Sequence, residues 1–337
     1  MRVAVVAPKP TSGEKGGAER LFAGLVWGLN ESGADAELVE VDSDESTYEK
    51  IQETYLRCYD LDLSGFDAVV STKAPTYLIR HDRHACYLLH TMRSFYDMYE
   101  QVFPRPSREI ELQRRLIIGL DTAALKPPRT RAVFSIGEEV AERLARHNGI
   151  ASRVLHPSSN LACRPGPQGD YILVPGRLHR WKRVDLVIDA LHLIRSDVRV
   201  KICGAGEDET FFRQQAKADR RIEFCGYVSD AQLIDLYSNA LAIAFVSIRE
   251  DFGYVALEAM MSAKPLITCK DSGEPARMIQ DGVTGFICEP NDIEISKAIR
   301  TLHENPEESL AMGIRARQQA PDSNWRRTAE ALLRALD

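Results

Sequence analysis

Short apolar segments rich in β-branched residues alternate along the chain with longer segments that have the 3.6-residue period of helices. Apolar runs between helices are typical of a parallel sheet covered on both faces. In the first half, the pattern predicts strands over residues 3–7, 38–41, 68–71, 85–89, 132–135 and 153–155. It predicts helices over residues 18–32, 92–101, 107–125 and 137–147.

The alternation stops at residues 160–170, where NLACRPGPQGD is rich in Pro and Gly and is expected to be a linker. It then resumes, with strands predicted over 171–174, 199–202, 222–224, 241–246, 265–268 and 285–287. The predicted helices cover 183–194, 208–217, 230–238, 253–262, 275–280, 292–304, 307–318 and 324–336. The pattern therefore indicates two doubly wound α/β units, with ligands expected at the carboxyl ends of their strands.

Length and charge agree with two ordinary globular cores. The chain has 337 residues, more than one core usually holds, and its net charge of -6 argues against a dedicated nucleic-acid binder. The charge is uneven: residues 105–131 hold seven Lys/Arg and three Asp/Glu, whereas residues 31–67 are acidic. Such runs are either solvated surface or, for the basic segment, a face toward an anionic acceptor or a membrane.

The cysteines and the apolar runs bear on the cellular setting. The seven cysteines are scattered without a C-x-x-C pair, which favours a reduced intracellular setting. No apolar run approaches the ~18 residues of a membrane-spanning helix. We expect a cytoplasmic protein, with membrane association left open.

Glycine and basic residues follow several predicted strands. Gly16-Gly17 lies in KGGAER, between the first strand and the first helix, and is either a tight turn or a site of close ligand approach. In the second half, Arg177 and Lys182 follow a strand and could grip a diphosphate, or cap carbonyls and face water. Further glycine turns follow at Gly204 and Gly226.

Two glutamates flank a glycine in REDFGYVALEAM. If Glu250 and Glu258 shared a helix, they would be ~12 Å apart along its axis at ~1.5 Å per residue. Glycosidase carboxylate pairs are closer, at ~5–5.5 Å or ~6.5–9.5 Å. If Glu250 lies in a loop that turns at Gly253, the two carboxylates can hold different parts of one ligand. The spacing favours this second arrangement over a hydrolytic pair.

Three histidines lie close together in RHDRHACYLLH. A metal site is disfavoured, because His81 and His84 precede the predicted strand and His90 follows it. A histidine at the carboxyl end of a strand is either structural or catalytic, and both possibilities stay open for His90.

The ordered segments GGAER, GRLHRWK, CGAGED, FCGYVS, REDFGYVALEAM and DGVTGFICEP resemble the retaining family 4 glycosyltransferases of the GT-B fold. The resemblance implies two Rossmann-like doubly wound domains facing a central cleft. The expected domains are an acceptor-side domain over 1–162, a nucleotide-sugar-binding domain over 163–318, and a helix in 319–337 that crosses back to the first domain. The donor would be a nucleotide-diphosphate sugar, with no cofactor and no metal.

The resemblance also implies roles for individual residues. Arg177 and Lys182 match the pair that binds the donor diphosphate, Glu250 the glutamate near the sugar hydroxyls, and Glu258 the one that binds the ribose. His90 matches a histidine near the transferred sugar. The remaining donor-binding residues implied are Gly17, Gly204, Gly226, Tyr227, Asp251, Phe252, Gly253 and Tyr254.

The chain departs from the family pattern at three positions. Asp251 and Ala263 replace common glycines, and Val246 replaces a common proline. The E-D-F-G form, together with LLHTMRSFYD, resembles the branch that contains O-antigen mannosyltransferases. This favours GDP-mannose as the donor and leaves UDP-hexoses open.

The expected activity is retaining transfer of a hexose from a GDP- or UDP-sugar to a hydroxyl acceptor on a glycan, glycolipid or small molecule. A nucleotide-sugar-binding protein without catalytic activity is the alternative. A dinucleotide oxidoreductase is disfavoured, because the G-x-G-x-x-G pattern is missing after the first strand.

Overall fold

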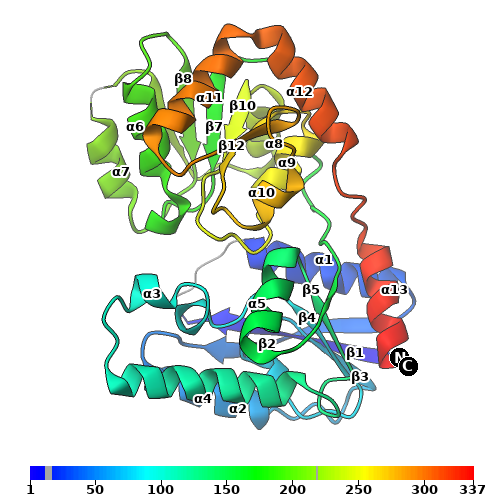
Figure 1. The fold of residues 1–337 in the computed structure, drawn as a ribbon. Coiled ribbons are helices and arrows are strands. Elements are labelled where there is room, and N and C mark those ends of the chain that lie inside the picture. Colours follow the sequence, from blue (N-terminus) through cyan, green and yellow to red (C-terminus); the bar gives the residue numbers. More distant parts are fainter. Residues whose placement is uncertain (12–16, 218) are drawn as a thin grey trace. The chain divides into compact units, whose positions relative to one another are not determined.

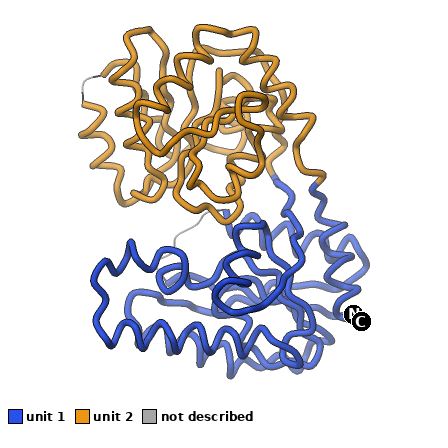
Figure 2. Tube along the Cα trace, in the orientation of Figure 1, with its two compact units in different colours: residues 1–160, 323–337 blue, residues 161–322 orange. Residues whose placement is uncertain are grey.

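The structure is a computed structural model that describes residues 1–11, 17–217 and 219–337. The chain divides into two compact units, which Figure 2 colours separately. The first unit contains residues 1–160 and the closing segment 323–337, and the second contains residues 161–322. Each unit is an α/β domain built on its own parallel sheet.

The first unit has a six-stranded sheet in the order β2-β1-β3-β4-β5-β6. The order reverses between β1 and β3, and ligands of doubly wound sheets bind beside the carboxyl ends of strands at such a switch point. The apolar middle of β1 and all of β3 are buried, as the sequence pattern requires of central strands. The strands are β1 (Arg2–Pro10), β2 (Asp35–Ser43), β3 (Ala68–Ser71), β4 (His84–Leu88), β5 (Ala132–Ser135) and β6 (Arg153–Val154).

Helices cover both faces of this sheet, with α1 and α13 on one face and α2 and α4 on the other (Figure 1). The α-helices are α1 (Gly17–Glu31), α2 (Tyr48–Tyr59), α3 (Tyr99–Val102), α4 (Arg108–Leu125), α5 (Glu138–Asn148) and α13 (Trp325–Leu336). Two 3₁₀ turns are η1 (Thr76–Leu78) and η2 (Arg93–Phe95).

The closing helix α13 packs on α1 through a tryptophan and two glycines. A Cβ atom on Gly24 would lie 2.3 Å from the Trp325 ring, and one on Gly28 would lie 2.6 Å from the Trp325 carbonyl oxygen. The Trp325 indole N–H donates to Asn160 Oδ1 at 2.7 Å, and the Asn160 amide donates to the Arg20 carbonyl at 2.7 Å. Close helix packing here depends on the missing side chains of the two glycines.

The second unit has a six-stranded parallel sheet in the order β12-β11-β10-β7-β8-β9. When the strands are numbered 1 to 6 from β7 to β12 and read from the β9 edge, the order is 3-2-1-4-5-6. This is the strand order of Rossmann dinucleotide-binding folds. The switch point therefore lies between the carboxyl ends of β7 and β10. The strands are β7 (Tyr171–Pro175), β8 (Arg199–Cys203), β9 (Ile222–Gly226), β10 (Ala242–Ala244), β11 (Leu266–Cys269) and β12 (Gly285–Cys288).

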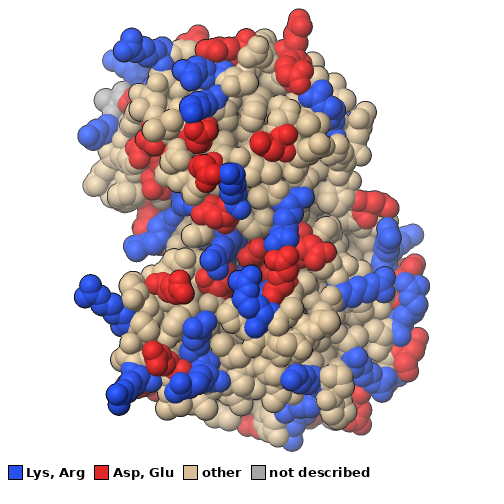
Figure 3. Space-filling model, viewed as in Figure 1, with Lys and Arg blue, Asp and Glu red and all other residues tan. Residues whose placement is uncertain are grey.

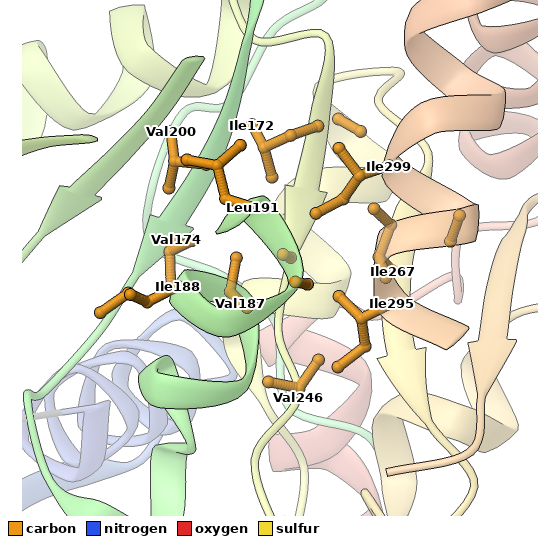
Figure 4. Packing of buried hydrophobic residues seen from close by; sticks show 14 of the residues in the cluster. Ile172, Val174, Val187, Ile188, Leu191, Val200, Val246, Ile267, Ile295 and Ile299 are labelled. Atoms are coloured by element: carbon orange, nitrogen blue, oxygen red, sulfur yellow. The ribbon is translucent and has the colours of Figure 1, made fainter. Parts of the chain in front are cut away.

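A core of interlocking aliphatic side chains holds the helices of the second unit to its sheet. Val187, Ile188 and Leu191 of α6 meet Ile295 and Ile299 of α11 over the strands (Figure 4). The helices are η3 (Arg180–Lys182), α6 (Val184–His192), α7 (Glu209–Ala216), α8 (Asp230–Ser238), α9 (Tyr254–Met261), α10 (Glu274–Met278), α11 (Asp292–Glu304) and α12 (Pro306–Gln318).

One helix prediction in the first unit is wrong, and one helix of this unit was not predicted. The helix predicted over 92–101 is instead the η2 turn and the short α3, interrupted at Tyr96, whose φ of -113° and ψ of -108° are not helical. Residues 48–59 form α2, which was not predicted from the sequence pattern. Its apolar residues Ile51, Tyr55 and Cys58 have helical spacing, and the Thr47 hydroxyl caps its start at Lys50 N.

Candidate functional site

The candidate site lies at the switch point of the second sheet. A pocket there is bordered by the ends of β7 and β10 and by the loop after β7. Its lining residues are Val174, Pro175, Gly176, Arg177, Leu178, Lys182, Val184, Ala244 and Phe245. The site thus occupies the position where doubly wound sheets bind ligands, and it contains both basic residues predicted to bind a diphosphate.

The glycine turns after β7 and β8 pack directly against each other. Gly204 has a φ of +128°, and a Cβ atom on it would lie 1.9 Å from the Gly176 carbonyl oxygen. A Cβ atom on Gly206 would lie 2.4 Å from the Leu178 carbonyl oxygen. Backbone packing therefore explains why glycine is required at both positions. The donor contact predicted for Gly204 is not needed to explain the glycine there.

Lys182 and Glu250 form an ion pair at the site. The Lys182 Nζ atom donates to Glu250 Oε2 at 2.5 Å, and the Ser247 hydroxyl donates to the same oxygen at 2.7 Å. The two charged side chains are 27% and 20% exposed, so a ligand can reach them. The Lys182 ammonium also lies 5.2 Å from the centre of the Phe245 ring, a cation–π distance. The structure therefore brings together two predicted residues that are 68 positions apart.

The main chain fixes Glu250 on both sides. Its N–H donates to the Ser272 carbonyl at 2.8 Å, and its own carbonyl accepts from Glu274 N at 3.0 Å. A Cβ atom on Gly273 would lie 2.5 Å from the Glu250 carbonyl oxygen, so this close approach requires glycine. Glu250 is held in a loop after β10 and not on a helix, which decides between the two arrangements left open by the sequence.

Arg177 forms an ion pair with a neighbouring glutamate. Its guanidinium forms a two-point contact with Glu207, with Nε–Oε2 and Nη2–Oε1 distances of 3.0 and 2.9 Å. The Arg177 side chain is 45% exposed, so it remains accessible to an anion. His179 Nε2 lies 3.5 Å from the same carboxylate, and burial lowers the pKa of His179 below its usual value. Glu207 stands in the segment CGAGED but was not among the predicted site residues.

Glu258 lies on α9 and is buried, with 4% of the residue exposed. Its Oε2 atom accepts a hydrogen bond of 2.9 Å from the Tyr237 hydroxyl of α8. Burial and the nearby Glu258 raise the pKa of Tyr237 well above its usual value, so this hydroxyl remains a donor. Tyr237 is a second residue that the sequence analysis missed, and its spacing from Glu258 gives no signal of the contact.

The segment between the glutamates turns at Gly253, whose φ is +73°. A Cβ atom there would lie 2.7 Å from Pro275 Cγ, so both the backbone angle and the packing require glycine. Asp251 and Phe252 are buried, and Tyr254 is half-buried at the first position of α9. Glu250 and Glu258 are thus separated by a left-handed turn, which fits two separate ligand contacts better than a shared helix face.

Gly226 is the last residue of β9, and Tyr227 follows it at the carboxyl-end edge of the second sheet. Gly226 has a φ of +66°, and the Tyr227 side chain is turned to solvent, with 87% of the residue exposed. The donor-binding roles implied for Gly226 and Tyr227 stay predictions.

Arg183 is a further charged residue of the site that sequence analysis did not single out. Its φ of +51° lies in the left-handed region, which is unusual for a side chain other than glycine. The guanidinium bonds Asp271 at 2.8 and 2.6 Å and the Val246 carbonyl at 2.6 Å. Arg183 thereby ties the loop that carries Lys182 to the loops after β10 and β11.

The remaining predicted residues belong to the first unit. His90 follows β4, and its Nδ1 atom lies 2.7 Å from the Thr91 carbonyl oxygen. Gly17 is the first residue of α1, whereas Gly16 lies outside the described residues. The roles of His90 and Gly17 at a donor site stay predictions.

His81, His84 and His90, the three histidines of the segment RHDRHACYLLH, have separate hydrogen-bond partners. His84 is buried between the Ser71 hydroxyl, at 2.8 Å, and the Thr130 hydroxyl, at 3.2 Å, and burial lowers its pKa to about 4. His81 Nε2 lies 3.1 Å from the Phe66 carbonyl oxygen. Within the described ranges, no group of three His, Cys, Asp or Glu side chains is arranged to hold a metal ion.

The family model described as "Glycosyl transferases group 1" matches residues 165–319. The human alpha-1,3/1,6-mannosyltransferase ALG2 is 28% identical over 170 residues, which are 45% of this chain and 41% of that protein. The glycogen synthase of Mycobacterium tuberculosis is 31% identical over 204 residues, which are 58% of this chain and 48% of that protein. The match thus spans less than half the length of either relative.

Solved structures of the same fold cover nearly the whole chain. Anabaena Alr3699/HepE in complex with UDP and glucose aligns over 99% of this chain and 100% of its own, with a TM-score of 0.75 and 15% identity. Sucrose-phosphate synthase of Thermosynechococcus elongatus aligns over 99% and 97%, with a TM-score of 0.78 and 16% identity. The predicted fold class is confirmed. The chain has the GT-B fold of two Rossmann-like units, and its second unit, with the Lys182–Glu250 pair, matches the glycosyl transferases group 1 family model.

Proposed function

We propose that the protein is a retaining glycosyltransferase that moves a hexose from a GDP- or UDP-sugar to a hydroxyl acceptor of a glycan, glycolipid or small molecule. The observation that carries the proposal is the Lys182–Glu250 pair at the switch point of a glycosyl transferases group 1 domain. A cation and a carboxylate in direct contact can hold the diphosphate and the sugar hydroxyls of one donor.

In this proposal, Lys182 and Arg177 bind the donor diphosphate and stabilise the negative charge that builds on it as the glycosidic bond breaks. These cations supply the role that a metal ion has in other transferases, and no cofactor is required. Glu250 accepts hydrogen bonds from the sugar, and Glu258 from the ribose. The N–H groups at the start of α9 face the phosphate or the sugar.

The choice of donor rests on the similarity of the chain to known glycosyltransferases. A mannosyltransferase is among the relatives, and a neighbouring structure holds UDP and glucose, so GDP-mannose and a UDP-hexose are the two donors proposed. Asp251 is buried beside the sugar-binding glutamate, in a position that is commonly glycine in the family. We expect its side chain to contribute to the choice between the sugars.

The setting of the reaction also stays a proposal. None of the helices in the described ranges is long and apolar enough to cross a bilayer. We expect the protein to act in the cytoplasm, with the basic segment 105–131 facing an anionic acceptor or a membrane.

The experiment that tests transfer is release of the nucleoside diphosphate from GDP-mannose and UDP-glucose. We expect release by the natural protein and none by Lys182→Ala, with Lys297→Ala as the matched control. Lys297 is an exposed lysine on α11 of the same unit, paired with Glu294. Near-normal release by a folded Lys182→Ala variant would contradict the diphosphate assignment.

The release assay together with a binding measurement separates the alternatives. A protein that binds a nucleotide sugar but releases no diphosphate would be the inactive binding protein. Binding of NAD without binding of any nucleotide sugar would support the oxidoreductase.

A further inference from the structure

Glu207 is a charged residue of the site to which the proposed reaction assigns no role. It lies in the turn after β8, and its carboxylate contacts the Arg177 guanidinium at two points, at 3.0 and 2.9 Å. The face of the second unit in Figure 3 carries Lys and Arg side chains beside Asp and Glu side chains. The Arg177–Glu207 pair concerns the reaction because Arg177 lines the pocket at the switch point.

The main chain holds the turn that carries Glu207 against the loop that carries Arg177. The Leu178 N–H donates to the Ala205 carbonyl at 3.0 Å, and the Asp208 N–H donates to the Leu178 carbonyl at 3.0 Å. Neither bond involves the Glu207 side chain, which is 46% exposed. The carboxylate can therefore leave Arg177 by rotating about its own side-chain bonds, while both loops stay in place.

A histidine in the same loop offers this carboxylate a second donor. His179 Nδ1 accepts a hydrogen bond of 3.1 Å from the Trp181 N–H, so in the neutral ring the hydrogen is on Nε2. His179 Nε2 lies 3.5 Å from Glu207 Oε1. A Glu207 carboxylate that turns away from Arg177 thus remains near a donor group.

A diphosphate would compete with Glu207 for the guanidinium of Arg177. The two side chains are 45% and 46% exposed, and an ion pair this exposed shifts an equilibrium by at most about fivefold. Phosphate binds a guanidinium with the same two-point geometry as a carboxylate, and a nucleoside diphosphate carries more than one negative charge. The diphosphate should therefore win the competition, at the cost of breaking the ion pair.

We propose that Glu207 exchanges with the donor diphosphate on Arg177. The carboxylate occupies the guanidinium in the ligand-free protein, gives it up when the diphosphate binds, and takes it back as the nucleoside diphosphate leaves. Glu207 is thus a positioning residue that acts through Arg177, and it weakens the binding of the product. This inference rests on the proposed function, because it requires that Arg177 binds the diphosphate.

The test is calorimetric titration of the full chain with UDP and with GDP, without sugar or acceptor. Glu207→Gln and Glu207→Ala should each bind the nucleotide about threefold to fivefold more tightly than the natural protein, because the competing carboxylate is gone. Glu294→Gln is the matched control and should bind as the natural protein does. Glu294 is an exposed glutamate of the same unit, at 40%, paired with Lys297, and its replacement changes the net charge equally. Thermal melts report whether each variant is folded.

A gain in affinity is a result that mere damage to the structure would not produce. Weaker binding by a folded Glu207→Ala variant would overturn the proposal, since it would show that Glu207 holds Arg177 in place for the ligand. Unchanged affinity in both Glu207 variants, or an equal gain in Glu294→Gln, would overturn it as well.

Arg177→Ala separates this inference from the proposed function. It should weaken nucleotide binding, and adding Glu207→Gln to it should have no further effect. If Arg177→Ala binds more weakly while the Glu207 variants show no gain, the exchange is wrong and the diphosphate role of Arg177 stands. If Arg177→Ala binds as tightly as the natural protein, or if neither nucleotide binds the natural protein, the donor assignment itself is contradicted.

Discussion

Lys182 and Glu250 are suited to a functional test because Glu250 keeps other partners when Lys182 is removed. The two side chains are 27% and 20% exposed. Removing the lysine leaves Glu250 with its bond from Ser247 and with its main-chain bonds to the 272–274 turn. A loss of donor binding in Lys182→Ala can therefore be assigned to the missing cation and not to a damaged fold.

Asp121 should make the stability of the first unit depend on pH. Burial raises the pKa of Asp121 to about 6, against about 3.9 for an unfolded aspartate. The folded state thus favours the protonated form. Its stabilising contribution is complete below about pH 4 and is lost as the pH rises through about 6. The difference corresponds to on the order of 3 kcal/mol, at ~1.4 kcal/mol per unit.

The check is urea unfolding of the natural protein and of Asp121→Asn between about pH 4 and about pH 7. Because asparagine does not ionise, the free energy of unfolding of the natural protein should fall relative to that of the variant as the pH rises. A difference that stays constant over this range would contradict the shifted pKa.

Ala263 has a φ of +54°, a left-handed angle that costs a side-chain residue about 1–2 kcal/mol. Ala263→Gly should remove this strain and give back about 0.4–1 kcal/mol through the more flexible unfolded chain. We expect a net gain of up to about 1 kcal/mol, measured as a higher melting temperature. Gly313→Ala is the opposing control, since its Cβ atom would lie 2.1 Å from the Ala263 carbonyl oxygen. A lower melting temperature for Ala263→Gly would show that the strain is not there.

At the scale of elements, the contact between α1 and α13 depends on two glycines that face Trp325. Gly24→Ala places a methyl group against the indole ring, and overpacking of this kind costs about 1–3 kcal/mol. The control is Gly119→Ala on α4, where a new Cβ atom meets nothing within 4 Å. It should stabilise by about 1 kcal/mol through helix propensity. Equal effects of the two variants on urea unfolding would contradict the packing described.

The Arg183–Asp271 contact joins three loops of the site, and we expect it to set the position of Lys182. Arg183→Gly keeps the left-handed backbone angle of +51° at low cost but loses the side-chain bonds to Asp271 and Val246. We predict a folded variant with donor affinity about tenfold weaker, which is the effect of ~1.4 kcal/mol. Calorimetric titration with the donor provides the measurement. Unchanged affinity in the variant would show that Lys182 is positioned without this contact.

The sequence predicted the strands well because a parallel sheet is buried on both faces and needs apolar runs, as in residues 68–71 and 132–135. It failed at residues 92–101, where aromatic side chains pack on one another and override helical spacing. Local motifs led to Lys182, Glu250 and Glu258. They could not lead to Tyr237 or Asp271, because those contacts join residues 21 and 88 positions apart. Such partners are set by the sheet order, and the sequence alone does not give this order.

At the scale of the whole molecule, the two units differ in their similarity to known proteins. The family match covers residues 165–319, so the second unit has support from both fold and family. The first unit has support from fold alone, through structures that align with 99% of the chain. The predicted donor site thus lies mainly in the unit that the family model matches, and the acceptor is predicted to bind on the first unit.

The central claim is that the second unit binds a nucleotide-diphosphate sugar through Lys182. The most direct measurement is a thermal-shift series with UDP-, GDP- and dTDP-sugars on the natural protein, Lys182→Ala and Lys297→Ala. A donor at ~100 times its dissociation constant should stabilise the natural protein and Lys297→Ala by ~2.7 kcal/mol and leave Lys182→Ala unshifted. No shift of the natural protein with any of these sugars, or an equal shift in Lys182→Ala, would contradict the claim.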